Sequence, residues 1–306
     1  MALFIFPFLV ANASYSNDWK WSVISEMAAP EFAISELCRE LSEVYAKHKW
    51  PQVGCEKFPF KIFGWSARKR PLIQYERGDI KSAKITLIQC AIHGDEKTAL
   101  PMCMNVIRDL ENGSKSLPEK MRLVVQPLLN PDGYLSNPST RNNANGIDIN
   151  RNFPTPEWDK LAHSFWMNKD KSDPRKFPGN YQGSEPETQA IIKSIDDIKP
   201  QKIIAIHTPL GFLELDTKGD KDKERRARFL AINMLKNTKD LDFKAFGVWP
   251  GSLGNYSGRY KQIPVYTLEL PPGDSKKRAD RNWDSFAFGL FRAIGFDLDT
   301  GRFHED

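Results

Sequence analysis

The chain has 306 residues, of which 40% are hydrophobic and 27% are charged, and its formal net charge is +5. This composition is ordinary for a soluble globular protein that buries a full core as one large domain or two small ones. Because the basic residues are interspersed with acidic ones, the excess charge indicates a solvated surface, and we expect no nucleic-acid partner.

The N-terminus reads MALFIFPFLVANASYSNDW and contains an apolar stretch of signal-peptide length. Ala11-Asn12-Ala13 has the small-x-small pattern of a cleavage site before Ser14. We therefore expect a signal peptide over residues 1–13, a single domain over 14–306, and a periplasmic or secreted protein. The stretch is too short to span a bilayer, so we expect no stable membrane association. It lacks a positive n-region, which leaves a buried N-terminal strand in a cytoplasmic protein as the alternative.

Hydrophobic periodicity then predicts alternating helices and strands. A helix over 31–48 is followed by two short strands, 57–66 and 71–78, that form a hairpin at a sheet edge. The remaining elements in chain order are a strand over 84–92, a helix over 97–113, a strand over 122–129, a helix over 184–198 with Ser184 as N-cap, a strand over 202–207, a helix over 222–238, a strand over 264–270 and a helix over 282–295. Strands alternating with helices predict an α/β sheet covered on both faces.

Two further features stand out between these elements. Residues 134–183 are rich in Asn, Pro, Lys and Asp and have little periodicity, and a loop of that length in a compact domain is usually functional. The four cysteines form no CxxC pair, which argues against a structural zinc ribbon. Cys90 and Cys103 are most simply buried thiols, whereas Cys38 and Cys55 flank a polar segment and could form a disulfide in an exported protein.

Three predicted strands end in possible metal ligands or titratable groups. The first runs into His93 and Glu96, the second ends at His207, and the third reaches Glu269. Functional groups of an open α/β sheet gather beyond the carboxyl ends of its strands. Two histidines and a carboxylate suit zinc and leave a position for water, with Glu269 as a candidate general base. HxxE alone is a weak signal, since a histidine at a strand end is more often structural.

The remaining histidines and the irregular segment over 134–183 are further candidates for this site. His48, His163 and His304 lie in polar or irregular stretches, and we expect them at the surface. The stretch RNNANGIDINRNFP, over 141–154, is either a solvated loop or a group of donors for an acidic substrate end, because arginine matches a carboxylate in bidentate geometry.

HGDE, NPDGY, RNNANGIDINRNFP, SEPET, the strand-end His207 and TLEL together resemble the zinc carboxypeptidase family from about residue 84 to 295. The resemblance implies an α/β fold around a mixed, mostly parallel eight-stranded sheet sandwiched by helices, one zinc ion and a peptide substrate. It implies His93, Glu96 and His207 as zinc ligands. Glu269 matches the glutamate that activates water, and Arg141 matches the arginine that stabilises the oxyanion.

The same resemblance implies that Asn150 and Arg151 hold the terminal carboxylate of the substrate, while Asp148 supports the loop. Trp249 stands near the position of the family's mobile tyrosine, and that role is left unassigned. We expect the pocket to be lined by Leu253, Gly254, Asn255 and Tyr256. HTPLGFLELD, WPGSLGNYSG and TLELPPG are most similar to the murein peptide amidase branch, which cuts between γ-D-glutamate and meso-diaminopimelate.

Two other functions remain open from the sequence. Deacylases of N-acyl amino acids, of the aspartoacylase or succinylglutamate desuccinylase kind, share HGDE and NRNF, although NPDGY, SEPET and TLELPP favour a peptidase. A non-catalytic peptidoglycan-binding module could retain the fold, but it should lack a ligand or the base, and this sequence contains all of them.

Overall fold

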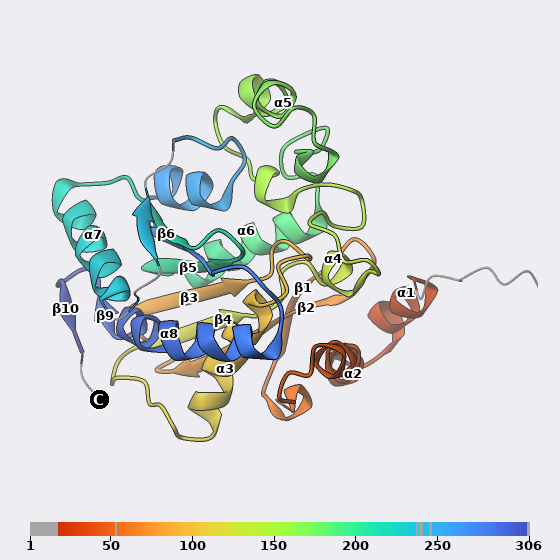
Figure 1. The fold of residues 1–306 in the computed structure, drawn as a ribbon, viewed down its shortest axis with the longest axis horizontal. Coiled ribbons are helices and arrows are strands. Elements are labelled where there is room, and N and C mark those ends of the chain that lie inside the picture. The colour runs from red at the N-terminus through yellow and green to blue at the C-terminus, as the bar shows by residue number, and fades with distance from the viewer. Residues whose placement is uncertain (1–17, 53, 237, 239–240, 245–246, 305–306) are drawn as a thin grey trace, which may run out of the picture.

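The fold is taken from a computed structural model that describes residues 18–52, 54–236, 238, 241–244 and 247–304. The expected signal peptide over 1–13 lies outside these residues. Within them, an eight-stranded mixed sheet forms the centre of the molecule, in the order β1-β2-β4-β3-β5-β8-β6-β7 (Figure 1). Its strands are β1 Lys61–Trp65, β2 Pro71–Gly78, β3 Ile85–Cys90, β4 Arg122–Gln126, β5 Lys202–His207, β6 Phe212–Asp216, β7 Asp242–Lys244 and β8 Val265–Glu269.

The sheet is parallel at its centre, where β4, β3, β5 and β8 lie side by side. β1 and β2 form the predicted antiparallel hairpin at one edge, and β6 runs antiparallel to β8 near the other. The mixed, mostly parallel eight-stranded sheet is confirmed. β6 and β7 were not predicted as strands, and a second small sheet pairs β9 Phe296–Asp297 with β10 Arg302–Phe303.

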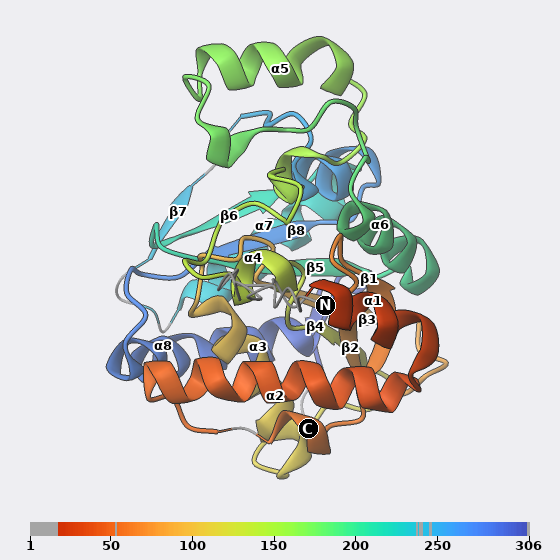
Figure 2. The same cartoon turned by 90° about the vertical axis from the view of Figure 1, so that its right-hand side faces the viewer.

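Helices cover both faces of the sheet, as predicted (Figures 1 and 2). Alternate side chains of the central strands enter two apolar cores, as shown by Ile88 on one face and Leu87 on the other. α2, α3, α7 and α8 contribute to the first core and α6 to the second. The helices are α1 Asp18–Met27, α2 Pro30–His48, α3 Ala99–Glu111, α4 Pro131–Leu135, α5 Trp158–Asn168, α6 Pro186–Ile198, α7 Lys221–Leu235 and α8 Lys276–Ile294. No helix of the described residues is long and apolar enough to cross a membrane.

Several local predictions require correction. α6 begins at Pro186 after Glu185, and the Ser184 hydroxyl donates to the Glu185 carboxylate, so Ser184 is not the N-cap. The segment over 134–183 contains the helix α5, with short 3-10 turns at Ile149–Arg151 and Pro174–Lys176. α8 starts six residues before the predicted start at 282, with Ser275 capping it by accepting from the amide of Arg278.

The cysteines form two disulfides. Cys38 in α2 pairs with Cys55, as the sequence allowed for an exported protein. Cys90 at the end of β3 pairs with Cys103 in α3, so the expectation of two buried thiols is wrong. Both residues are buried, and their Cα atoms are 6.3 Å apart because α3 packs directly against β3. The return of α3 onto β3 is a tertiary event that cysteine spacing does not reveal.

Candidate active site

The sheet order brings the three predicted strand ends together. β3, β5 and β8 are consecutive neighbours, and His207 lies directly opposite Glu269 in the parallel register of β5 and β8. His93 and Glu96 lie in the turn that follows β3. All four of these residues are at most 8% exposed. The carboxyl ends of adjacent parallel strands thus build one buried site.

His93, Glu96 and His207 form a candidate metal site. One potential ligand atom from each lies within 4.8 Å of the others. Nδ1 of His93 lies 2.6 Å from Oε1 of Glu96, and Nδ1 of His207 lies 3.0 Å from Oε2 of the same carboxylate. Burial by itself raises the pKa of Glu96, but the charges of His93 and His207 outweigh burial and hold this pKa below its ordinary value.

Backbone contacts fix the turn that carries the first two ligands. A Cβ atom on Gly94 would lie 2.1 Å from the carbonyl carbon of Gly133, so only glycine lets the HGDE and NPDG turns approach this closely. The carbonyl oxygen of Arg141 accepts from Nδ2 of Asn130 at 3.1 Å and from the amide of Gly94. The two turns therefore hold the start of the RNNANG segment against the metal ligands.

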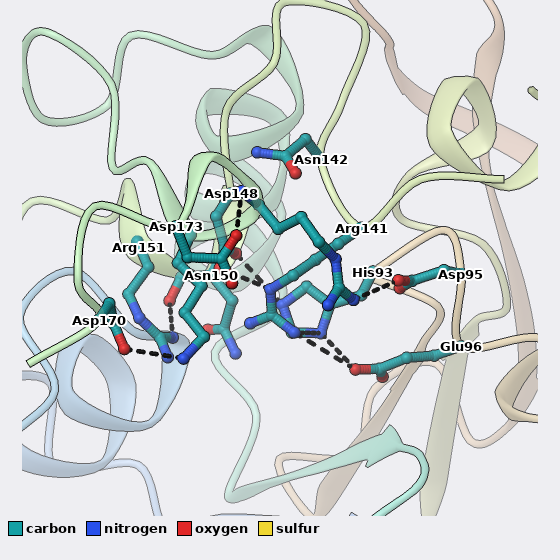
Figure 3. Close-up of polar contacts among 12 residues, drawn as sticks. His93, Asp95, Glu96, Arg141, Asn142, Asp148, Asn150, Arg151, Asp170 and Asp173 are labelled. Atoms are coloured by element: carbon teal, nitrogen blue, oxygen red, sulfur yellow. Dashed lines mark hydrogen bonds and ion pairs between the residues drawn. The ribbon is translucent and has the colours of Figure 1, made fainter. Parts of the chain in front are cut away.

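Asp148 connects that segment to the site (Figure 3). Its Oδ1 lies 3.2 Å from Nε2 of His93, and its Oδ2 accepts from Nε of Arg141 at 2.8 Å. Oδ1 also accepts from the backbone amide of Asn150 at 2.9 Å, which supports the loop as the resemblance implied. A carboxylate on the outer nitrogen of a ligand histidine orients the ring and strengthens it as a ligand. The contact with His93 was not predicted.

This donor set fits zinc. Two imidazoles and one carboxylate, with space for a further ligand, are the composition of a catalytic zinc site. Imidazole nitrogens bind zinc and similar first-row transition metals in preference to magnesium or calcium, which prefer oxygen ligands. The contact of the Asp148 carboxylate with the second ring nitrogen of His93 is also typical of zinc sites, where such a contact orients the ligand.

Glu269 lies beside the metal ligands with the properties of a proton acceptor. Burial raises the pKa of its carboxyl above the ordinary value, His207 opposes this shift, and Glu96 adds to it. Oε2 of Glu269 accepts from the backbone amide of Leu210 at 3.4 Å. The carboxyl group also lines a cavity of about 410 Å³ that the metal ligands share.

Arg141, Asn150 and Arg151 line the same cavity. Oδ1 of Asn150 accepts from the amide of Leu253 at 2.8 Å, and Nη1 of Arg151 donates to the carbonyl of Asn150 at 2.8 Å. The guanidinium of Arg151 lies 4.9 Å from the ring centre of Trp249. Its Nε is buried and has no hydrogen-bond partner among the described residues, so the group has donors to offer a ligand.

Of the four residues expected to line the pocket, the structure places one in the cavity. Gly254 lines the cavity, and a Cβ there would lie 2.1 Å from Oδ2 of Asp216. Leu253 and Tyr256 are instead buried in the second apolar core, where the ring of Tyr256 packs 5.5 Å from that of Phe153. Asn255 is also buried and donates to the carbonyl of Trp249. Asn255 and Tyr256 belong to the π-helical turn Gly254–Tyr260, which directs their side chains inward, and sequence spacing did not predict this.

Several lining residues were missed from the sequence. Phe212, Glu214 and Asp216 are alternate residues of β6, and all three line the cavity. Their spacing of two residues could have predicted that they lie together, because alternate residues of a strand point to the same face of the sheet. Lys176 also lines the cavity and belongs to a short 3-10 turn in the long irregular segment. No sequence pattern around it indicates that position.

The remaining histidines do not contribute ligands. The ring of His48 stacks on Trp50, and that of His163 packs against Trp158 and Phe177. His304 lies 3.7 Å from a carboxylate oxygen of Asp297. Among the described residues, only one group of three or more His, Cys, Asp or Glu side chains could hold a metal ion, and it is the predicted one.

The sequence model of the zinc carboxypeptidase family matches residues 60–211, which include all three metal ligands. The chain belongs to the zinc carboxypeptidase family. With its His-Glu-His set intact, it is a family hydrolase with a single catalytic zinc site, and the binding-only alternative is rejected.

Individual relatives agree with this assignment. Murein peptide amidase A of Vibrio campbellii is 29% identical over 227 residues, which are 73% of this chain and 84% of the relative. The protein of the same name from Escherichia coli K12 is 28% identical over 72% of this chain and 84% of its own length.

Solved structures confirm the fold. The murein-tripeptide amidase of Escherichia coli O157 superposes with a TM-score of 0.55 and 28% identity, over 78% of this chain and 94% of that one. Thrombin activatable fibrinolysis inhibitor has a TM-score of 0.62 over 92% of this chain and 80% of its own, with 19% identity. At that identity the second likeness supports the fold alone.

Proposed function

We propose that this zinc hydrolase cleaves the amide bond between γ-D-glutamate and meso-diaminopimelate in murein peptides. The observation that carries the proposal is that the His-Glu-His site, Glu269, Arg141, Asn150 and Arg151 all line one cavity. The similarity to murein peptide amidases over most of both chains supports the substrate class.

The proposed chemistry assigns a distinct task to each residue. Zinc, when bound, supplies Lewis acidity and lowers the pKa of water to near 7. Glu269 accepts the proton from the attacking water and passes it to the leaving amine, a role that suits a buried carboxyl with a raised pKa. Arg141 presents a guanidinium, held by Asp148, to the negative charge that develops on the carbonyl oxygen.

Asn150 and Arg151 hold the free carboxylate of the leaving residue in this proposal. Arg151 supplies a planar set of donors, and its Nε has no partner among the described residues. The Trp249 ring restricts the guanidinium from one side. These contacts select substrates in which the scissile bond precedes a terminal carboxylate.

The charges of the cavity also suit the side chain of diaminopimelate, which ends in both an ammonium and a carboxylate group. Glu214 and Asp216 bring negative charge to the cavity wall, and Lys176 brings positive charge. Nζ of Lys176 pairs with Asp170 at 2.8 Å, and the Lys176 side chain is 36% exposed. A leaving residue that carries both charges can interact with these side chains, whereas a purely apolar one cannot.

The direct test uses L-Ala-γ-D-Glu-meso-diaminopimelate with zinc-loaded wild type and the Glu269→Gln variant. We expect the wild type alone to release diaminopimelate, measured by mass spectrometry. N-acetyl-aspartate and N-succinyl-glutamate serve as competing substrates. Faster hydrolysis of either, with no cleavage of the tripeptide, would replace the murein assignment by the deacylase alternative.

We also propose that the protein is exported and works in the periplasm or outside the cell. The two disulfides support this location, because disulfides persist mainly in oxidising compartments. Cell fractionation with mass spectrometry of the mature N-terminus tests the proposal. Recovery of the reduced, full-length chain in the cytoplasm would contradict it.

A further inference from the structure

A second cavity, of about 310 Å³, lies next to the one described above. Glu96, Arg141, Thr208 and Pro209 line both cavities, so the two meet at the metal site. Asn150 and Arg151 line only the first cavity, which the proposed function assigns to the leaving residue. The second cavity is therefore placed to receive the acyl side of the scissile bond.

Lys97 is one of the charged residues that line the second cavity and not the first. It is half-buried and follows the metal ligand Glu96 directly. Its Nζ donates to the carbonyl oxygen of Tyr134 and lies 3.8 Å from the centre of the Tyr134 ring. The Tyr134 hydroxyl in turn donates to the carbonyl of Lys97 at 3.1 Å. The buried tyrosine therefore holds the ammonium group in one place.

The other charged groups of the cavity have nearby partners. Asp95 pairs with Arg175 at 2.6 Å, and the exposed carboxylate of Asp274 lies 3.6 Å from the ring nitrogen of His48. Glu96 belongs to the metal site. Lys97 forms no ion pair with a carboxylate among the described residues, although an ammonium group carries three donors. A half-buried cation of this kind is suited to an anionic group of a ligand.

The proposed substrate carries such a group at the right place. In a γ-linked D-glutamate the α-carboxylate stays free and is separated from the scissile carbonyl by the short side chain, ~5 Å when extended. An ordinary α-linked peptide has its next amide bond in that region in place of a carboxylate. The acyl side of the substrate would thus present an anion within the cavity that Lys97 lines.

We propose that Lys97 binds the free α-carboxylate of the γ-linked D-glutamate and makes the enzyme selective for γ-linked acyl groups that carry this carboxylate. This inference rests on the proposed function and adds an acyl-side specificity residue to it. Lys97 binds substrate beside the metal site and takes no part in proton transfer.

The test compares the tripeptide with its counterpart in which the α-carboxylate is a carboxamide. We expect wild type to favour the free carboxylate by about 10- to 100-fold in kcat/KM, the range for a charge-assisted hydrogen bond. Lys97→Met should lose this preference and hydrolyse the carboxamide at the wild-type rate. Lys97→Arg, which keeps the charge, should retain part of the preference. Lys81→Met removes an exposed lysine elsewhere and should behave as wild type.

Melting temperature and zinc content show whether each variant is folded, and the wild-type comparison of the two substrates needs no variant. Equal rates of wild type on both substrates would overturn the role of Lys97 and leave the proposed function intact. An equal loss of kcat/KM on both substrates in a folded Lys97→Met protein would also overturn the role of Lys97, because that pattern indicates a structural role through Tyr134. Failure of wild type to cleave either substrate would overturn the proposed function, and this inference with it.

Discussion

His207 and Glu269 lie directly opposite each other on the neighbouring parallel strands β5 and β8. This register places the third metal ligand and the proposed base at one end of the sheet. A rigid backbone ladder, and not a flexible loop, therefore sets the separation between them. Catalytic groups held by such elements keep their geometry more precisely than groups on loops.

The first prediction concerns Glu269→Gln. The amide has nearly the same shape as the carboxyl group but cannot accept the proton, so we expect kcat to fall by about 10²- to 10⁴-fold. The zinc content, measured by elemental mass spectrometry, should stay at one ion per chain, because Glu269 is not in the ligand set. A variant with near-wild-type turnover would exclude Glu269 as the base.

Asp148→Asn should weaken the metal site without removing a ligand. The carboxylate contacts the outer nitrogen of His93, and loss of such support typically lowers metal affinity by about 10- to 100-fold. Competition with a zinc chelator measures this shift. His93→Ala provides the comparison and should bind zinc far more weakly than Asp148→Asn. Unchanged affinity in Asp148→Asn would show that the contact does not tune the metal.

Arg151→Met should remove selectivity for a free terminal carboxylate. We expect kcat/KM on the tripeptide to fall by about 10- to 100-fold, because a charge-assisted hydrogen bond to the substrate is lost. The same substrate with a carboxamide at its terminus should be hydrolysed equally by variant and wild type. If the variant still prefers the free carboxylate, another residue holds that group.

Glu187 should make stability depend on pH. It is buried at the start of α6, and burial raises its pKa from 4.5 to about 7. Between these values the folded protein binds more protons than the unfolded chain, so stability falls as pH rises. Glu187→Gln cannot titrate. The stability of the variant relative to wild type should therefore increase from pH 4.5 to 7, by at most about 3 kcal/mol.

Urea denaturation of both proteins at several pH values measures this difference. Other titrating groups are common to the two proteins and cancel in the comparison. Parallel pH profiles would show that Glu187 is ionised in the folded state near pH 5.

The two disulfides, whose four cysteines all belong to the first core, should stabilise the folded protein. Cys90 and Cys103 are 13 residues apart and Cys38 and Cys55 are 17 apart, so each bond closes a short loop of the unfolded chain. Replacing either pair by serines should lower the free energy of unfolding by about 3 kcal/mol. Thermal unfolding with and without reductant checks this. A melting temperature insensitive to reductant in the wild type would indicate that the bonds do not form.

The sequence by itself predicted which residues lie at the candidate site. His93, Glu96, His207 and Glu269 follow or end apolar runs that read as buried parallel strands, and strand ends of one sheet meet at one edge. The alternation of strands and helices likewise predicted the layers, because each pattern reflects a local period of side-chain burial.

Only the tertiary structure decided which distant residues meet these ligands. The Cys90–Cys103 bond depends on how α3 returns onto β3. The charged cavity wall depends on β6 pairing with β8, and the inward direction of Tyr256 depends on a π-helical turn. The setting of Lys97 depends on Tyr134, which is 37 residues away. Such contacts arise from packing between elements, and the local sequence pattern constrains only the conformation of each element by itself.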